Sequence, residues 1–226
     1  MPSTVVQVGL AFLVGVGLLG RYYDRRAAVF LLVAVLLPDA DTLVGLVMNG
    51  AHRTLLHNAV LPVVGMAVLY WETHVREVSW IRHRVGNYGT RLLWVGAFVH
   101  LFAHVFLDWT HLEGVNMLWP LRDQFFQLGG EAYYSTAEGF VQTFVEVFED
   151  PDTGQQSVDV GGGGSRQETH VSNPAQPSAD PSPDEPVDRR LPIAVQGWQL
   201  YLIVAGAFVA VAKRFQSPGV SESNDE

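Results

Sequence analysis

Cysteine is absent from the 226-residue chain, which excludes a disulfide framework and any thiolate metal site. A metal site would have to use His, Asp and Glu, whose nitrogen and oxygen atoms favour harder ions such as Zn, Mn or Mg. Lysine is nearly absent as well: Lys213 is the only one among 14 basic residues, against 23 acidic residues. This acidic, arginine-rich balance is typical of a salt-adapted, halophile-like composition. No basic stripe interleaved with aromatic residues is present, so nucleic acid is not an expected partner.

Hydrophobic residues make up 48% of the chain and gather in runs. Five runs approach the roughly 17–25 residues that a helix needs to cross a bilayer. They cover about residues 5–20, 27–48, 58–71, 92–109 and 193–212. The sequence therefore predicts an all-α, multi-pass transmembrane helical bundle of about five helices, with the lipid bilayer as a partner. The first run has a small-residue surface suited to close helix contact, formed by Gly9, Gly15, Gly17 and Gly20.

The placement of basic residues predicts the orientation, because arginine and lysine collect in cytoplasmic loops. An outside N-terminus and a cytoplasmic C-terminus put nine of the 14 basic residues on the cytoplasmic side of the cell membrane. These nine are Arg21, Arg25, Arg26, Arg76, Arg82, Arg84, Arg91, Lys213 and Arg214. In this arrangement the four from Arg76 to Arg91 occupy a loop between the third and fourth runs.

Composition divides the chain into five regions. They are a membrane domain with the polar motifs (1–121), an amphipathic extracytoplasmic segment (122–150), a disordered acidic linker (151–190), a final transmembrane helix (191–214) and a disordered tail (215–226). In the second region, Phe140, Phe144 and Phe148 recur at helical spacing and predict a helix over 133–148. The linker is rich in glycine, proline and acidic residues, and it cannot bury enough apolar surface to fold.

Three clusters of charged and imidazole side chains lie within or beside the predicted spans, where such groups are costly and mark candidate functional sites. The clusters are Pro38-Asp39-Ala40-Asp41, His52-Arg53-Thr54-Leu55-Leu56-His57, and His100 and His104 with Asp108 and His111. The second span runs outward, the third begins outside, and the fourth runs outward. All three clusters are therefore expected to meet at the outer membrane face.

Local spacing agrees with a shared site. His100, His104 and Asp108 form one stripe on a helix, so His104 and Asp108 can share a metal ion. Asp39 and Asp41 diverge on a helix but share one side of an extended segment, and the preceding proline favours a local break there.

The residue types point to a divalent metal centre. The predicted metal ligands are Asp39, Asp41, His104 and Asp108. His52 and His57 are candidates for further ligands or for general acid–base catalysis, and a turn between them would let both face the site. Arg53 could hold an anionic substrate group through bidentate hydrogen bonds.

Each candidate also has a structural alternative. Asp39 and Asp41 would equally serve as caps at a helix end, and Arg53 would equally extend its side chain to the membrane surface. His100 suits an interhelical hydrogen bond, and His111 suits the membrane interface. The combined set favours a metal site over polar groups that only hold helices together.

In order and spacing, the motifs resemble those of the YdjM-like family, a group of inner-membrane proteins described as metal-dependent hydrolases. The family pattern of P-D-x-D, H-R-x-x-x-H, H-x-x-x-D and a later Trp-Pro pair corresponds to Pro38-Asp39-x-Asp41, His52-Arg53-x-x-x-His57, His104-x-x-x-Asp108 and Trp119-Pro120. The resemblance covers about residues 1–121 and implies metal-dependent hydrolysis. The chain departs from the pattern in two places. The family often has a His in its first helix, and its second motif commonly ends Thr-His-Ser where this chain reads Leu56-His57-Asn58.

The leading hypothesis is a membrane-bound hydrolase that uses a divalent metal to activate water against a phosphoester or lipid-linked substrate. The second hypothesis is an ion-coupled transporter, since buried acids and histidines also build ion paths. Clustering at one face and the lack of an evident inverted repeat count against it. The third is a non-catalytic membrane scaffold. The sequence specifies no oligomeric state.

Overall fold

The computed structural model describes residues 3–48, 50–111, 113–137, 139–149, 156–159, 161–168, 193–194 and 196–216. The chain divides into two compact units. The helical unit contains Pro2–Leu36, Val64–Ala103 and Leu191–Glu226, and the motif unit contains Leu37–Val63 and His104–Arg190. Parts of the predicted linker (151–155, 160 and 169–190) and of the predicted tail (217–226) lie outside the described residues.

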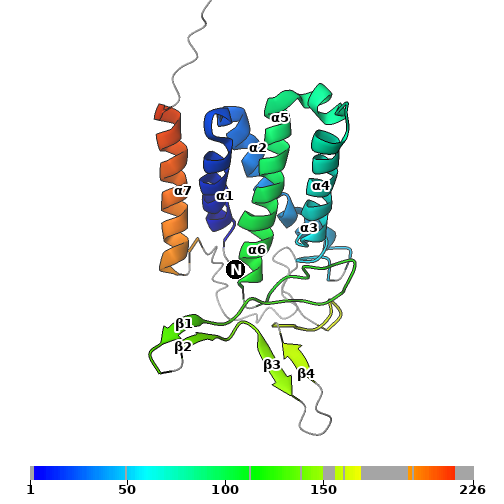
Figure 1. The fold of residues 1–226 in the computed structure, drawn as a ribbon, viewed down its shortest axis with the longest axis vertical. Coiled ribbons are helices and arrows are strands. Elements are labelled where there is room, and N and C mark those ends of the chain that lie inside the picture. Colours follow the sequence, from blue (N-terminus) through cyan, green and yellow to red (C-terminus); the bar gives the residue numbers. More distant parts are fainter. Residues whose placement is uncertain are drawn as a thin grey trace, which may run out of the picture. The chain divides into compact units, whose positions relative to one another are not determined.

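The helical unit is built mainly of five helices (Figure 1). Its elements are α1 (Thr4–Leu19), the 3₁₀ turn η1 (Gly20–Tyr22), α2 (Arg25–Leu36), α4 (Val60–Tyr70), the π-helical turn η3 (Trp71–Val75), α5 (Trp80–Phe98), the π-helical stretch η4 (Val99–Val105) and α7 (Gly197–Gln216). The first residues of α4 and the last of η4 belong to the motif unit.

The core of the helical unit lies between α1, α2 and α5. Leu19 on α1, Leu31 on α2 and Val95 on α5 are buried in it. Large apolar side chains on outward faces are exposed instead, as Val33 and Phe208 are. An apolar outer surface of this kind marks a membrane-facing protein.

Among the residues that the structure describes, two helices are long and apolar enough to cross a membrane: Thr4–Tyr22 and Trp80–Trp109. A third span would consist of Arg25–Leu36 and Pro38–Val44, which are bent by 44° relative to each other. Val60–Val75 and Gly197–Lys213 are apolar but shorter. The chain is therefore mostly helical with two candidate membrane spans.

Helices α1 and α7 pack side by side although they lie far apart in the sequence (Figure 1). A Cβ atom on Gly206 of α7 would lie 2.1 Å from the backbone oxygen of Gly9 on α1. Only glycine lets two backbones approach this closely. The small-residue surface predicted for the first helix is thus confirmed at Gly9. At Gly17, by contrast, a Cβ atom would meet no neighbour within 4 Å.

The helix at the fourth apolar run begins earlier than predicted. α5 starts at Trp80, so Arg82, Arg84 and Arg91 lie on a helix and not in a loop. The apolar-run criterion misses this start because the arginines lower the local hydropathy. Gly86 has φ 66° and ψ −176°, which kinks α5 between its basic beginning and its apolar remainder.

The motif unit consists of short elements joined by turns. Its elements are η2 (Pro38–Ala40), α3 (Asp41–Val44), α6 (Phe106–Trp109), β1 (Ala132–Ser135), β2 (Gly139–Gln142), β3 (Glu146–Glu149) and β4 (Gln156–Asp159). β1 pairs antiparallel with β2, and β3 pairs antiparallel with β4, in two separate sheets (Figure 1).

The helix predicted over 133–148 is wrong, because this segment forms β1, β2 and β3. Its aromatic and β-branched residues favour strands. Gly139 has a φ of 76°, a left-handed conformation that a right-handed helix cannot contain. The helical spacing of the phenylalanines is coincidental, since Phe140 lies in β2 and is 72% exposed.

Part of the segment predicted to be a disordered linker is structured. Residues 156–159 form β4, and the carbonyl of Gly161 accepts a hydrogen bond from the backbone of Gln127 at 2.9 Å. Arg166 forms an ion pair with Asp123 at 3.1 Å. The prediction rested on low apolar content, but here the glycine run lets two backbones pair directly. A Cβ atom on Gly161 would lie 2.1 Å from the carbonyl oxygen of Gln127.

Candidate metal centre

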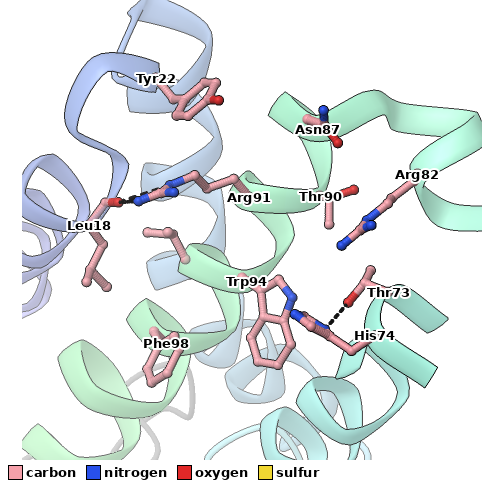
Figure 2. A pocket seen from close by; sticks show the side chains of 11 residues that line it. Leu18, Tyr22, Thr73, His74, Arg82, Asn87, Thr90, Arg91, Trp94 and Phe98 are labelled. Carbon is pink, nitrogen blue, oxygen red and sulfur yellow. Dashed lines mark hydrogen bonds between the residues drawn. The ribbon is translucent and has the colours of Figure 1, made fainter. Parts of the chain in front are cut away.

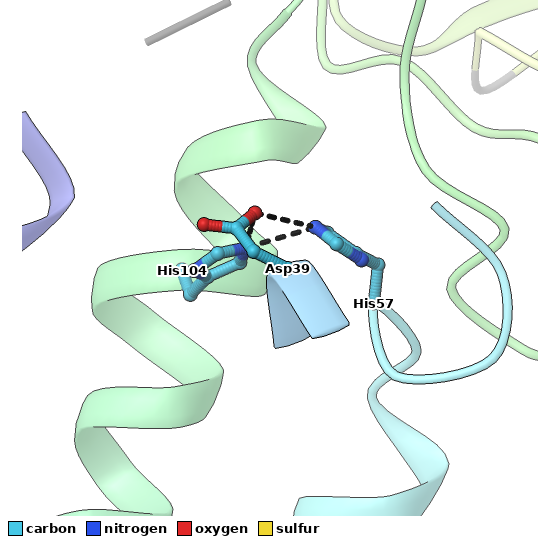
Figure 3. A group of neighbouring side chains, drawn as sticks. All are labelled: Asp39, His57 and His104. Carbon is cyan, nitrogen blue, oxygen red and sulfur yellow. Dashed lines mark hydrogen bonds and ion pairs between the residues drawn. The ribbon is translucent and has the colours of Figure 1, made fainter. Parts of the chain in front are cut away.

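The first polar cluster lies where α2 ends. Pro38 begins the 3₁₀ turn η2, and the chain bends there by 44°. The predicted break is present, but the segment is helical and not extended. Asp39 and Asp41 therefore point in different directions. Asp39 faces His57 and His104 (Figure 3), whereas Asp41 faces the turn that carries the second cluster.

The second cluster lies in a series of tight turns before α4. Arg53 has a φ of 58°, in a left-handed region that non-glycine residues rarely adopt. Its carbonyl accepts a hydrogen bond from the backbone N–H of Asn116 at 3.1 Å. Oδ1 of Asn58 accepts one from the backbone N–H of Leu61 at 3.0 Å and so caps the start of α4. These bonds fix the turns in place.

Asp41 holds both histidines of the second cluster. Its Oδ2 lies 2.8 Å from Nδ1 of His57, and its Oδ1 lies 3.1 Å from Nδ1 of His52. All three side chains are buried. When Nδ1–H of His57 is donated to Asp41, the Nε2 lone pair of the neutral ring points away from Asp41 and is available to a metal.

The third cluster crosses from η4 into α6. His104 lies in η4 and Asp108 lies one helical turn later in α6. Nε2 of His104 is 3.6 Å from Oδ2 of Asp108, so the helical stripe brings these two groups together. His100 belongs to the helical unit and is not part of this group.

Asp39, His57 and His104, one from each of the three clusters, form a group whose ligand atoms all lie within 4.8 Å of one another, and Asp108 lies beside its two histidines. Nε2 of His57 lies 2.9 Å from Nε2 of His104 and 3.4 Å from Oδ2 of Asp108. Oδ1 of Asp39 lies 3.7 Å from Nε2 of His57 and 3.6 Å from Nε2 of His104. Figure 3 shows Asp39, His57 and His104 reaching this point from three separate segments.

The spacing of Asp39, His57 and His104 fits three ligands of a four-coordinate metal ion. Atoms that bind a metal tetrahedrally at about 2.0–2.1 Å are about 3.3 Å from one another. The three distances among the ligand atoms of Asp39, His57 and His104 run from 2.9 Å to 3.7 Å and bracket that value. His57 and His104 are fully buried, whereas the side chain of Asp39 is 33% exposed. The group is therefore open to its surroundings on the side of Asp39.

The charges of the site favour an added cation. Ionised Asp39, Asp41 and Asp108 carry three negative charges, and Arg53 is the positive side chain buried among the motifs. Burial lowers the pKa of His57, but hydrogen bonds to the surrounding carboxylates outweigh it and raise that pKa well above its ordinary value. The carboxylates thus stabilise positive charge at this point, which is the charge that a divalent metal would supply.

Arg53 is the largest fully buried side chain among the described residues. Its Nη1 donates to the carbonyl of Gly114 at 3.1 Å and lies 3.4 Å from Oε2 of Glu113. Its Nε and Nη2 are buried with no hydrogen-bond partner in the described part of the chain. Nε and Nη2 form the edge through which arginine side chains in general bind phosphate or carboxylate in a bidentate manner.

Two asparagines shape the site, and the sequence pattern did not single them out as important. Asn58 caps the start of α4, because its side-chain oxygen accepts the backbone N–H of Leu61. A capping residue just before an apolar run was the available signal. Asn116 links the turn that carries Arg53 to the segment that carries Asp123. Its side-chain amide donates to Asp123 at 2.6 Å, and its backbone N–H donates to the carbonyl of Arg53. No local pattern marks Asn116, because its partners lie in other turns.

Comparison with known proteins gives one match. The model of a family described as YdjM inner membrane protein matches residues 1–158, which is more than half of the chain. The match extends beyond the motifs into the strands of the motif unit. No curated protein and no solved structure matches the chain significantly.

Proposed function

The chain belongs to the YdjM inner membrane protein family, and we propose that it is a membrane-bound, metal-dependent hydrolase. The proposed ligands of its divalent metal are Asp39, His57, His104 and Asp108. One observation carries the proposal: Asp39, His57 and His104 come from three separate clusters, yet their ligand atoms all lie within 4.8 Å of one another, and Asp108 lies beside both histidines. Zn, Mn and Mg are all compatible with such a ligand set.

A metal bound at this point would polarise a phosphoester oxygen and lower the pKa of a coordinated water. The residues around it have distinct proposed roles. The exposed side of Asp39 is the proposed entrance for water and substrate. Asp41 orients His57 through Nδ1, so we place Asp41 behind the ligands and not among them.

His52 is the proposed general acid–base. Its Nδ1 is anchored on Asp41, while its Nε2 is buried with no hydrogen-bond partner among the described residues. Its ring centre lies 5.6 Å from that of His57, close enough to serve a substrate bound at the metal. A carboxylate that orients an imidazole in this way is a common arrangement for proton transfer.

Arg53 is the proposed contact for the negative charge of the substrate. Its unpartnered edge of Nε and Nη2 matches two oxygens of a phosphate group. The guanidinium is held from its other side by Gly114 and Glu113, so it is already oriented. This favours a phosphoester, and the membrane setting favours one that is linked to a lipid.

For the membrane arrangement, we infer a multi-pass bundle in which α1, the bent pair of α2 and α3, α4, α5 and α7 all cross the bilayer. The shorter apolar helices, Val60–Val75 and Gly197–Lys213, support this if their ends lie at the interface. The arginine distribution supports an outside N-terminus and a cytoplasmic C-terminus. The metal centre would then serve the outer face.

Metal content tests the proposal. Wild-type protein and the Asp108→Asn variant are purified identically and analysed for Zn, Mn and Mg. Wild type should hold about one metal per chain, and Asp108→Asn should lose most of it, because the amide keeps the shape but removes a charged ligand. Glu131→Gln is the matched control, since Glu131 is an exposed carboxylate away from the cluster, and it should keep wild-type metal content.

A folded wild type that holds no metal, and takes none up on reconstitution, would reject the metal centre and leave the polar residues as a scaffold. Equal metal in wild type and Asp108→Asn would remove Asp108 from the ligands. Hydrolysis is tested separately on phosphoester and lipid-linked phosphate substrates, with and without a chelator. Metal-loaded protein without turnover on any of them would overturn the enzymatic part of the proposal.

A further inference from the structure

The helical unit contains a second polar site that the metal centre does not use. It is a pocket of about 390 Å³ between the end of α1, the turn η3 and the first half of α5 (Figure 2). All of its lining residues belong to the helical unit. They include two arginines, and none of the described residues that line it carries a carboxylate. Its charge therefore suits an anion.

The two arginines have different surroundings. The guanidinium of Arg91 already has partners within the protein. Its Nε and Nη2 donate to the carbonyl of Leu18 at 3.2 Å and 2.7 Å, and it lies over the ring of Tyr22. The guanidinium of Arg82 has no hydrogen bond or ion pair to any described residue. Figure 2 shows it directed toward Thr90, on the inner side of the pocket. Arg82 is thus the donor that an incoming anion would find unoccupied.

The kink at Gly86 makes this arrangement possible. In a straight helix, Arg82 and Thr90 would be separated by about 12 Å along the axis, at 1.5 Å per residue. The positive φ of Gly86 interrupts the helix, and both residues line the same pocket. The hydroxyl of Thr90 donates to the carbonyl of Gly86 at 2.8 Å and stabilises the break.

One part of the pocket lining is aromatic. Trp94 and Phe98 lie along one side of α5, with their ring centres 6.4 Å apart. The ring of His74 completes this wall at 6.5 Å from Trp94. A lining that combines arginines with aromatic rings matches an amphiphile, whose charged group and apolar chain would each meet a suitable surface.

The position along the helices is that of a bilayer interface. The pocket lies where the candidate span Thr4–Tyr22 ends and where the apolar helix Val60–Val75 ends. Exposed tryptophans at the neighbouring chain turn, Trp71 and Trp80, are residues that favour this depth. Lipid phosphates lie at the same depth, and basic pockets between membrane helices bind such headgroups.

We propose that this pocket binds the phosphate of an anionic phospholipid from the surrounding leaflet. Arg82 pairs with the phosphate, and the first part of an acyl chain lies against Trp94 and Phe98. The proposal rests on the pocket alone and does not depend on the metal centre or on hydrolysis.

The test is lipid binding to the full chain in neutral detergent, measured by native mass spectrometry. The probes are short-chain phosphatidylglycerol, phosphatidylcholine of the same chain length, and inorganic phosphate. Wild type should bind one phosphatidylglycerol at least about tenfold more tightly than either other probe. Arg82→Gln should weaken phosphatidylglycerol binding by about tenfold, the effect of losing one charge-assisted partner.

Arg84→Gln is the matched control, because Arg84 is exposed on the same short segment of α5 but does not line the pocket. It should change the affinity less than twofold. Both arginines are exposed, and unchanged melting temperatures will show that the variants fold. Equal losses in the two variants would reduce the effect to general surface charge and reject the pocket. Phosphatidylcholine binding equal to phosphatidylglycerol would reject the charge preference, and equally tight inorganic phosphate would reject the lipid as the source.

Discussion

Asp39 and Asp41 are chemically identical and two residues apart, yet their surroundings give them different chemistry. Asp39 lies within 3.7 Å of Nε2 of both His57 and His104 and is partly exposed. Asp41 is fully buried, and each of its oxygens faces the Nδ1 atom of a histidine. One helical turn thus supplies both a candidate ligand and the group that orients another ligand.

Asp41→Asn should separate these two roles. Loss of the orienting carboxylate should weaken metal affinity by about 10–100-fold while leaving the metal stoichiometry intact at saturating metal. His57→Ala, which removes a proposed ligand, should lower the stoichiometry itself. Competition of each purified variant with a metal chelator measures both quantities. If Asp41→Asn abolishes binding at every metal concentration while remaining folded, Asp41 is a ligand and the proposed arrangement is wrong.

The sequence could predict that the three clusters meet, but it could not assign the individual roles. The meeting follows from the alternating direction of the apolar runs and from the four-residue spacing of His104 and Asp108. The role of His57 depends on turns in which Arg53 has a left-handed backbone conformation. Arginine rarely adopts this conformation, so the sequence does not predict it. Asp39 and Asp41 are separated in role only because the segment after Pro38 is helical.

Among the helices, the contact between α1 and α7 joins the two ends of the described chain. It relies on backbone approach at Gly9 and Gly206, where a methyl group would have no room. Such packing is a main source of helix association in membranes, because apolar side chains gain no hydrophobic free energy by moving from lipid into a contact between helices. The contact fixes the position of α7, which is otherwise connected through residues outside the described range.

Gly206→Ala should destabilise the protein by about 1–3 kcal/mol, because the added methyl group forces two backbones apart. This corresponds to a melting temperature several degrees lower, at about 2–4 °C per kcal/mol for a chain of this size. Gly17→Ala is the control on α1, because open space surrounds that position. It should not lower the melting temperature. The measurement is thermal unfolding in one detergent, and equal behaviour of the two variants would contradict the close α1–α7 contact.

Elements dominated by apolar periodicity could be predicted, and elements dominated by turn geometry could not. The runs at 5–20 and 193–212 became α1 and α7 with shifts of a few residues. The segment 133–148 carried apolar residues at helical spacing, but the left-handed Gly139 and the pairing of Tyr134 with Phe140 make it a hairpin. Strand pairing is a contact between segments, and spacing along one segment does not report it.

For the whole molecule, the distribution of charge relative to the apolar helices is the property from which its orientation in the membrane is predicted. Most basic residues of the helical unit lie in two stretches, from Arg21 to Arg26 and from Arg76 to Arg91, and the second stretch lies largely on the first part of α5. The motif unit carries the candidate metal centre and the two pairs of antiparallel strands. In the proposed orientation, the positive-inside rule would place both arginine-rich stretches on the cytoplasmic side.

Single cysteines test this orientation cleanly, because the chain has none of its own. Arg84→Cys should be protected from a membrane-impermeant thiol reagent in intact cells and should react once the cells are permeabilised. Glu131→Cys should react in intact cells. Both positions are exposed, so protection reports the membrane and not burial. Labelling at 84 but not at 131 in intact cells would invert the orientation and place the metal centre at the cytoplasmic face, where a lipid-linked substrate of the outer leaflet could not reach it.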